Sequence, residues 1–403
     1  MRIAMISEHA SPLAALGGVD AGGQNMHVAE LSAALAAAGH EIRVYTRRDD
    51  PGLPDLVPLD ERLDVVHVPA GPPDRLPKDA LLPFMGAFGD WLAAEWRDRW
   101  RPDLAHAHFW MSGLAAVTAA RQCGVPVAQT FHALGSVKRR HQGTVDTSPP
   151  QRIGYERAVG RAVDRVVVQC HDEIAELLRL GVPRQRMALV PSGVNTGRFR
   201  PTGPVAPREP GRARILTVAR LVERKGIEDL IRAMPRLARA ELVVVGGPPD
   251  GDIEADRYAC RLREVADQCR VADRVRLVGA VSPDEMPSWY RSADVLAATP
   301  WYEPFGLTVL EAMACGVPVV ATAVGGLADT VVDGVTGDLV APRDPAGLAR
   351  TLRHLLTDDT RRFGYGAAAA DRAVHSYAWP RIAGRIAAVY GAITTRTPAE
   401  VAV

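Results

Sequence analysis

The stretch Trp301–Gly316, WYEPFGLTVLEAMACG, decides the fold of the second half of this chain. A loop that carries Glu303 runs through a Phe-Gly turn into a helix expected to begin near Leu307, which places Glu311 on the second turn. Gly316 is suited to end that helix, and a proline two residues later leads into the next strand. Free amides at a helix start favour an anion such as a diphosphate. Two nearby carboxylates favour hydroxyl groups, so the stretch predicts a nucleotide-sugar site.

Bulk composition sets the class of the protein. The chain has 403 residues, too many for one ordinary core, so two domains are expected. Its 48 basic and 47 acidic residues argue against a nucleic-acid surface or a polybasic membrane anchor. No stretch approaches the ~18 apolar residues of a membrane span, and the start of the chain, MRIAMI, has no signal-peptide pattern. The 5 scattered cysteines fit a reducing compartment, so a cytoplasmic location is expected.

Short β-branched runs alternate with helical patterns on both sides of Arg200–Arg214, a segment rich in Pro and Gly that is typical of a linker. The alternation predicts an α/β protein with two doubly wound, Rossmann-like domains on parallel sheets, facing a central cleft. The expected domains are 1–200 and 211–378, with a final helix at about 381–403 packing back on the first. Strands are expected at 3–6, 42–46, 65–68, 104–106, 127–130, 166–168 and 188–190, and then at 215–219, 242–245, 275–277, 295–298, 319–322 and 338–340.

The loop after the first strand, Ser7–Gln24, is longer than most strand-to-helix connections and ends in Gly22-Gly23, just before a helix expected at Asn25–Ala38. Two glycines at that point allow the backbone to approach a phosphate. A flexible turn without a ligand is about equally consistent with the pattern. The spacing is not GxGxxG, which disfavours a nicotinamide cofactor.

Basic residues and histidines supply further candidates at strand ends. Arg220 and Lys225 flank a strand-to-helix turn and are suited to neutralising a leaving diphosphate, although an isolated pair is more often a solvated loop. His132 ends a strand, where it is suited to bonding a sugar hydroxyl. The run that begins at Lys138 is suited to attracting an anionic acceptor, or else is a solvated face. The Gly-Gly turn at 325–326 is equally consistent with a contact to the nucleotide and with a structural turn that binds no ligand. His106 and His108 are expected to be structural.

The ordered set of motifs resembles the family 4 retaining glycosyltransferases of the GT-B fold, over nearly the whole chain. The motifs that carry the resemblance are Ala21–Asn25 (AGGQN), His132, Arg220 with Lys225, and the Glu303…Glu311 pair. It is closest to the branch that holds sucrose-phosphate synthases and the mycothiol-pathway enzyme that glycosylates inositol phosphate. The resemblance implies a retaining, metal-independent transfer of a hexose from a nucleotide-diphosphate sugar, with no further cofactor.

The resemblance also implies roles for individual residues. The first domain would bind the acceptor, and the second would bind the donor, with UDP favoured over GDP. Gly23, beside Gly22, would place its amide on a donor phosphate, and Arg220 and Lys225 would hold the diphosphate during catalysis. His132 would contact the donor sugar near the reacting carbon. The donor sugar would bind Glu303 and the amides of Phe305, Gly306 and Leu307, and the ribose would bind Glu311.

The acceptor side departs from the inositol-phosphate enzyme, whose phosphate site uses a Lys, a Tyr, a Thr and an Arg. Lys78 matches the Lys and Arg152 the Arg, but Phe109 and Ala133 stand where the two hydroxyl donors belong. Each missing neutral hydrogen bond costs roughly 0.5–1.5 kcal/mol. Inositol 1-phosphate is therefore not expected to be the acceptor. A small polar molecule of specialised metabolism is expected instead, bound by Asn25, Lys78, Phe109, Lys138 and Arg152.

Three other functions compete with this hypothesis: a nucleotide-sugar epimerase of the same fold, a sucrose-phosphate-synthase-like enzyme acting on a sugar phosphate, and a non-catalytic sugar-nucleotide binding protein. The spacing of Glu303 and Glu311 and the cations Arg220 and Lys225 favour transfer over epimerisation. The intact His132, Lys225 and Glu303 argue against a decayed enzyme. The expected partners are a donor and an acceptor, with no nucleic acid and no membrane insertion, and a homodimer remains open.

Overall fold

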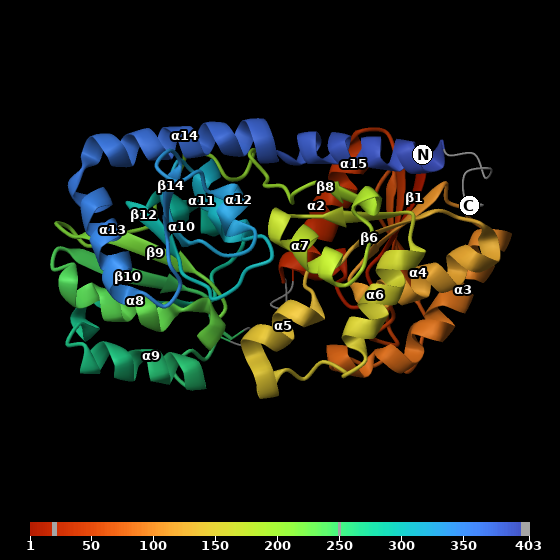
Figure 1. The fold of residues 1–403 in the computed structure, drawn as a ribbon, viewed down its shortest axis with the longest axis horizontal. Coiled ribbons are helices and arrows are strands. Elements are labelled where there is room, and N and C mark those ends of the chain that lie inside the picture. Colours follow the sequence, from red (N-terminus) through yellow and green to blue (C-terminus); the bar gives the residue numbers. More distant parts are fainter. Residues whose placement is uncertain (18–21, 249–250, 396–403) are drawn as a thin grey trace. The chain divides into compact units, whose positions relative to one another are not determined.

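The computed structural model describes residues 1–17, 22–248 and 251–395. It divides the chain into two compact units, Met1–Ser192 with Trp379–Val403, and Gly193–Ala378 (Figure 1). The segment Arg200–Arg214, predicted to be a linker, belongs to the second unit. There Ala206 N donates to Ser288 O at 3.0 Å. The segment is therefore packed against its own unit.

The described residues of the first unit form an eight-stranded sheet in the order β3-β4-β2-β1-β5-β6-β7-β8. All pairs are parallel except β3 with β4. The order reverses at β1, between β2 and β5, and loops at the carboxyl ends of strands meet at such a switch point. The strands are β1 Arg2–Ile6, β2 Glu41–Arg47, β3 Leu56–Asp60, β4 Leu63–Val68, β5 Leu104–His108, β6 Val127–Thr130, β7 Arg165–Val168 and β8 Met187–Leu189.

Two elements of the first unit differ from the sequence expectation. The sheet is parallel as predicted except at its edge, where the unpredicted strand β3 pairs antiparallel with β4 and alternates exposed and half-buried residues. Pro58 lies within it, and proline is tolerated in a sheet at an edge. The loop predicted at Ser7–Gln24 contains the short helix α1, Pro12–Gly17. Residues 18–21 of that loop lie outside the described residues.

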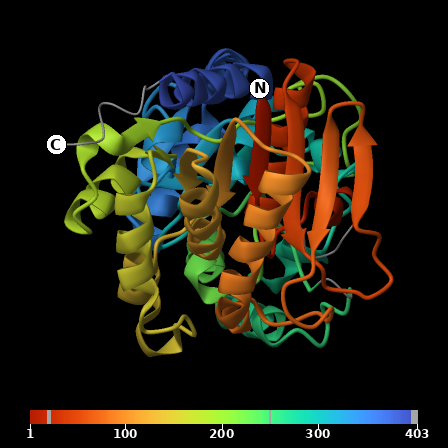
Figure 2. The same cartoon turned by 90° about the vertical axis from the view of Figure 1, so that its right-hand side faces the viewer.

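Helices cover both faces of this sheet. On one face α3 and α4 stand side by side (Figure 2) and bury Phe88, Trp96 and Trp110 in the core. On the other face α2 and α15 pack against Ile3, Met5 and neighbouring strand residues, with α15 contributing apolar side chains along its length. The α-helices described in this unit after α1 are α2 Gly23–Ala37, α3 Met85–Asp98, α4 Trp110–Cys123, α5 Gly135–Gln142, α6 Arg152–Ala162, α7 His171–Arg179 and α15 Trp379–Thr394.

The second unit has a fully parallel six-stranded sheet in the order β11-β10-β9-β12-β13-β14 over its described residues. Its strands are β9 Ala213–Val218, β10 Ala240–Val245, β11 Val275–Gly279, β12 Val295–Ala298, β13 Val319–Thr322 and β14 Gly337–Val340. The order reverses at β9, between β10 and β12. The doubly wound α/β architecture predicted from the sequence is confirmed in each unit.

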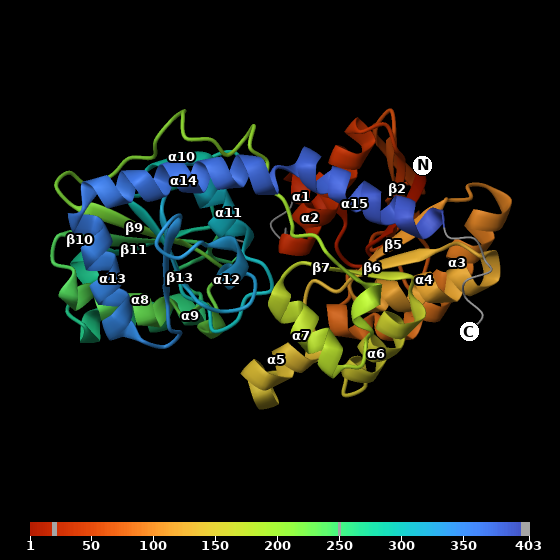
Figure 3. The same ribbon diagram turned by 45° about the horizontal axis from the view of Figure 1, so that its top comes forward.

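The helices of the second unit also form two layers (Figure 3). One core contains residues of α8, α9 and α13, and the other contains residues of α10, α11, α12 and α14. The helices are α8 Ile227–Ala233, α9 Arg257–Gln268, α10 Met286–Arg291, α11 Leu307–Ala314, α12 Leu327–Thr330, α13 Pro345–Thr357 and α14 Asp359–Tyr377. Among the helices of the described ranges, none combines the length and the apolar character needed to cross a membrane.

Candidate active site

Two loops meet at the switch point of the second unit, one after β9 and one after β12. Trp301 N donates to Arg224 O at 2.8 Å, and Thr299 Oγ1 donates to Gly226 O at 3.0 Å. Gly226 has a φ of 66°, and a Cβ there would lie 2.0 Å from Thr299 O, so only glycine fits. These contacts fix the loop that carries Lys225 against the loop that carries Glu303.

Lys225 and Glu303 form an ion pair at this junction, with 2.5 Å between Nζ and Oε2. Burial alone would raise the pKa of Glu303, but Lys225, followed by Arg224 and Arg220, brings it below its usual range. Glu303 is therefore ionised at neutral pH, and it is a strong hydrogen-bond acceptor. The sequence predicted these two residues at one site, and the structure brings them into contact.

Arg220 follows β9 in the same loop, and its side chain is exposed. Desolvation, and then the neighbouring Arg224, lowers its pKa, although a guanidinium remains charged at neutral pH. Within the described ranges the Arg220 side chain has no hydrogen bond and no carboxylate within ion-pair distance. It is therefore a cation whose donors are available to an anionic ligand.

The helix α11 begins at the same place, and glycines allow the close packing around it. Gly306 precedes its first residue with a φ of 88°, and a Cβ there would lie 2.3 Å from Leu327 Cδ2. Gly326 N donates to Glu303 O at 3.0 Å, and a Cβ on Gly325 would lie 2.1 Å from that oxygen. The Gly-Gly turn therefore supports the Glu303 loop. A small hollow lies between these loops and the start of α11.

Further along α11, Glu311 is half-buried and accepts a hydrogen bond from Tyr290 Oη at 2.6 Å. Burial, and then the Glu311 charge, raises the pKa of Tyr290, so the phenol stays protonated and fixes the carboxylate. Phe305 is buried in the core of this unit, which leaves its backbone for any ligand contact. Leu307 is the first residue of α11, as predicted.

In the first unit, α2 begins at Gly23 with Gly22 as its N-cap, and no side chain caps its first amides. Asn25, predicted to contact an acceptor, is buried, and its Nδ2 donates to Ser11 O at 3.1 Å. That bond ties α2 to the turn before α1. The amide nitrogen of Asn25 therefore has a partner within the fold.

Two of the three cations predicted at an acceptor site lie beside the Phe109 ring in the first unit, and the third, Lys138, is close enough to act on Lys78. Lys78 Nζ lies 4.9 Å from the centre of the Phe109 ring, and Arg152 Cζ lies 5.1 Å from it. Desolvation, and then the charges of Arg152 and Lys138, lowers the pKa of Lys78. Lys78 has no carboxylate within ion-pair distance in the part of the chain that the structure describes. It is the available ammonium of the group.

The other two cations are already paired. Arg152 Nε donates to Glu156 Oε1 at 2.8 Å, and its Nη2 donates to Ala133 O at 2.6 Å. Lys138 Nζ lies 2.9 Å from Asp146 Oδ1. Burial alone would raise the pKa of Asp146, but hydrogen bonds from Lys138 and from Ser148 lower it to about 2. The charge of each of these cations is therefore already balanced by a carboxylate.

Two residues at neighbouring strand ends have left-handed backbones. Phe109, after β5, has a φ of 84°, and His132, after β6, has a φ of 60°. Non-glycine residues rarely adopt such angles, and those that do are common at functional sites. The His132 ring stacks on His108, with 3.0 Å between His132 Nε2 and His108 Nδ1.

Comparison with known proteins decides the family. Residues 204–372 match the glycosyl transferases group 1 model, and residues 22–193 match the glycosyl transferase 4-like domain. The D-inositol 3-phosphate glycosyltransferase of Xylanimonas cellulosilytica is 38% identical over 99% of this chain and 98% of its own length. D-inositol 3-phosphate glycosyltransferase 1 of Catenulispora acidiphila is 37% identical over 96% and 95%. The chain is a family 4 glycosyltransferase.

Its fold agrees with that assignment. The structure of a sucrose-phosphate synthase from Thermosynechococcus elongatus superposes with a TM-score of 0.86 at 32% identity, covering 97% of this chain and 98% of the other. The glycosyltransferase thus has the GT-B fold that the sequence motifs predicted.

The glycosyltransferase also has candidate residues that the sequence reasoning missed. Glu8 follows β1 and is buried, and its carboxylate accepts hydrogen bonds from Ser112 Oγ and at 2.7 Å from His9 Nδ1. The His9 ring lies edge-on to Phe109, with 4.9 Å between centroids. Their position at the carboxyl end of the central strand is the signal that would have identified them.

Proposed function

We propose that this glycosyltransferase moves a hexose from a nucleotide-diphosphate sugar, UDP favoured and GDP second, to a small polar acceptor, with retention and without a metal. The observation that carries the proposal is the Lys225–Glu303 pair beside the glycine-preceded start of α11. A cation, a fixed carboxylate and unoccupied helix amides are the groups that a diphosphate with an attached polyol needs. The resemblance to the inositol-phosphate branch favours UDP.

The chemistry assigned to these residues is electrostatic. As the bond between the sugar and the diphosphate breaks, negative charge builds on the leaving oxygen, and Lys225 and Arg220 stabilise it. Glu303 accepts hydrogen bonds from sugar hydroxyls and fixes the ring, and Glu311, held by Tyr290, accepts those of the ribose. The acceptor proton passes to the leaving diphosphate on the same face, so no side-chain base is required.

The acceptor proposed is not inositol 1-phosphate. Lys78 is the available cation, because Glu156 holds Arg152 and Asp146 holds Lys138. Phe109 offers a ring face where a phosphate would need a hydroxyl donor. Among the residues that the structure describes, a phosphate dianion would thus meet only the Lys78 ammonium without a carboxylate partner. An uncharged or weakly anionic polyol, an aminocyclitol or a thiol would not need more than this one cation.

A second candidate is transfer to a sugar phosphate, in the manner of a sucrose-phosphate synthase. The observation that favours it is the 32% identity to that enzyme over 97% of this chain. Lys78 would then bind the phosphate. The two candidates share the donor site and differ in the acceptor alone.

The test has two stages. Thermal shifts with UDP, GDP, ADP and TDP identify the base, and a selective shift of several degrees for one of them is expected. Transfer is then assayed with that sugar nucleotide and with inositol 1- and 3-phosphates, inositol, fructose 6-phosphate, aminocyclitols and small thiols. NMR of the product gives the anomeric configuration, and EDTA should leave the rate unchanged. No shift with any nucleotide would refute the donor assignment, and fastest turnover of inositol 1-phosphate would refute the acceptor assignment.

A further inference from the structure

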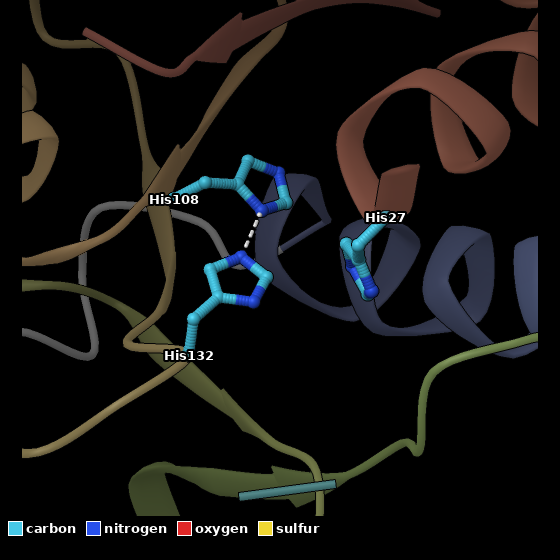
Figure 4. A group of neighbouring side chains, drawn as sticks. All are labelled: His27, His108 and His132. Carbon is cyan, nitrogen blue, oxygen red and sulfur yellow. Dashed lines mark hydrogen bonds between the residues drawn. The ribbon is translucent and has the colours of Figure 1, made fainter. Parts of the chain in front are cut away.

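A cluster of three histidines lies inside the first unit (Figure 4). His27 comes from α2, His108 from the end of β5 and His132 from the turn after β6. One ring nitrogen from each lies within 4.8 Å of the other two. The sequence pattern did not predict this cluster, because the three residues are far apart in the chain.

The spacing suits a transition-metal ion. Three imidazole nitrogens bound tetrahedrally at about 2.0–2.1 Å lie roughly 3.4 Å apart. His108 Nδ1 and His132 Nε2 are already 3.0 Å apart, so these two rings need to separate only slightly. The His27 ring, edge-on to His132 with 4.9 Å between centroids, is the one that must approach. Nitrogen ligands favour zinc and its neighbours over magnesium or calcium.

The surroundings hold the rings ready for an ion. Burial lowers the pKa of all three, that of His27 to about 3, so each imidazole is neutral and has a lone pair to offer. His27 Nδ1 lies 2.7 Å from Ser192 Oγ, a contact that leaves Nε2 as the ligand atom. His132 is half-buried and so is the ring with partial access to solvent.

We propose that His27, His108 and His132 bind one Zn²⁺ ion and that the bound ion inhibits the enzyme by occupying the ring nitrogen of His132 and so removing it from contact with the donor sugar. The inhibition rests on the proposed function, which gives His132 a contact with the donor sugar. The binding of Zn²⁺ does not depend on that function. The site is inhibitory and separate from the metal-independent transfer. The fourth zinc position is left for water.

Binding is tested first, without any substrate. Purified, EDTA-treated and desalted protein is titrated with Zn²⁺ by calorimetry and with Co²⁺ by visible absorption, because tetrahedral Co²⁺ absorbs strongly. One equivalent of Zn²⁺ and an intense visible Co²⁺ band that Zn²⁺ abolishes are expected. Weak binding of several ions without that band would overturn the proposal, since surface histidines and carboxylates would account for it.

A variant locates the site. His27→Gln should remove the Co²⁺ band and weaken Zn²⁺ binding by about tenfold or more, and His375→Gln, which changes an exposed histidine of α14, should alter neither. Circular dichroism checks that each variant is folded. If His27→Gln is unstable, His27→Phe replaces it in the same titrations. Zinc binding by a folded His27 variant equal to that of the wild type would refute the assignment.

Inhibition is tested last and separately. One equivalent of Zn²⁺ should lower the transfer rate of the wild type, EDTA should restore it, and the His27→Gln rate should be insensitive to Zn²⁺ relative to its own metal-free rate. If zinc binds at the cluster without changing the rate, the inhibitory role is wrong while the metal site stands. If the protein transfers no sugar at all, the proposed function fails and the binding result is unaffected.

Discussion

Replacing Lys225 with alanine tests the catalytic assignment most directly. The substitution removes an ammonium that lies 2.5 Å from Glu303 Oε2, in a pair whose side chains are 19% and 16% exposed. Loss of one preorganised group that stabilises transition-state charge costs about 3 kcal/mol. At 25 °C that is roughly a 150-fold loss in rate. The unpaired Glu303 carboxylate would also repel the diphosphate. The largest expected loss in kcat/KM is therefore about 1000-fold, which corresponds to a barrier higher by on the order of 4 kcal/mol.

The same variant has a signature in its pH profile. In the wild type Lys225 holds the pKa of Glu303 low, so the ionised carboxylate is retained well into the acidic range. Without Lys225 burial dominates, and the pKa of Glu303 rises. Residual activity that requires the carboxylate should therefore disappear at a higher pH than in the wild type as the solution is acidified. The acid limb of the profile should move toward neutral pH.

The assay is initial-rate release of the nucleoside diphosphate, with kcat and KM determined for the donor. The control is Arg232→Ala, which removes an ion pair on α8 in which 2.8 Å separates Arg232 Nη2 from Glu228 Oε2. Its kcat/KM should stay within about twofold of the wild-type value, because such pairs contribute about 0.3–0.5 kcal/mol. Combining Lys225→Ala with Glu303→Gln should cost less than the sum of the two single losses, since the pair acts as a unit. A folded Lys225→Ala enzyme with kcat/KM within threefold of the wild type would refute the reasoning.

Three further outcomes are expected. Glu311→Ala should weaken nucleotide binding about tenfold, the equivalent of one charged hydrogen bond, and an unchanged Kd by calorimetry would disprove the ribose role. Gly306→Ala should lower the free energy of unfolding in urea by about 1–3 kcal/mol, because the φ of Gly306 is 88° and the added methyl would meet Leu327. The control, Gly384→Ala on α15, adds a methyl in open space and should not destabilise the protein. Tyr390→Phe removes the hydroxyl that lies 2.6 Å from the buried His106 Nδ1, and the loss of this partner should lower the free energy of unfolding by about 1–3 kcal/mol. A thermal unfolding midpoint equal to that of the wild type would contradict this prediction.

The fold was predictable where hydrophobic runs are short and bounded. Every strand expected in the second unit is present within two residues of its predicted ends, because buried parallel strands there are continuous runs such as Leu242–Val245. The edge strand β3 was missed because its residues are half-exposed and include Pro58. The short α1 was missed because the surrounding loop is rich in glycine.

The candidate site was predictable to the extent that it lies at strand ends. Lys225 and Glu303 follow β9 and β12, which are adjacent in the sheet. The family resemblance assigned both residues to one donor site, whereas the adjacency of the two strands is known only from the structure. The pairing of Arg152 with Glu156, by contrast, depends on side-chain geometry that no periodicity encodes. His27 falls on the buried face of α2, where a sequence pattern shows a core position and gives no sign of two partner histidines.

The path of the chain has a consequence for how this protein is made. Residues 193–378 form a complete unit of their own, but the first unit needs α15, whose Ile382, Ile386 and Tyr390 fill the face of its sheet opposite α3 and α4. A ribosome therefore finishes the second unit before it finishes the first, although it starts the first one earlier. Until residue 394 emerges, the nascent chain exposes an apolar sheet face to chaperones. A message truncated after residue 378 would encode a folded second unit tethered to an incomplete first unit.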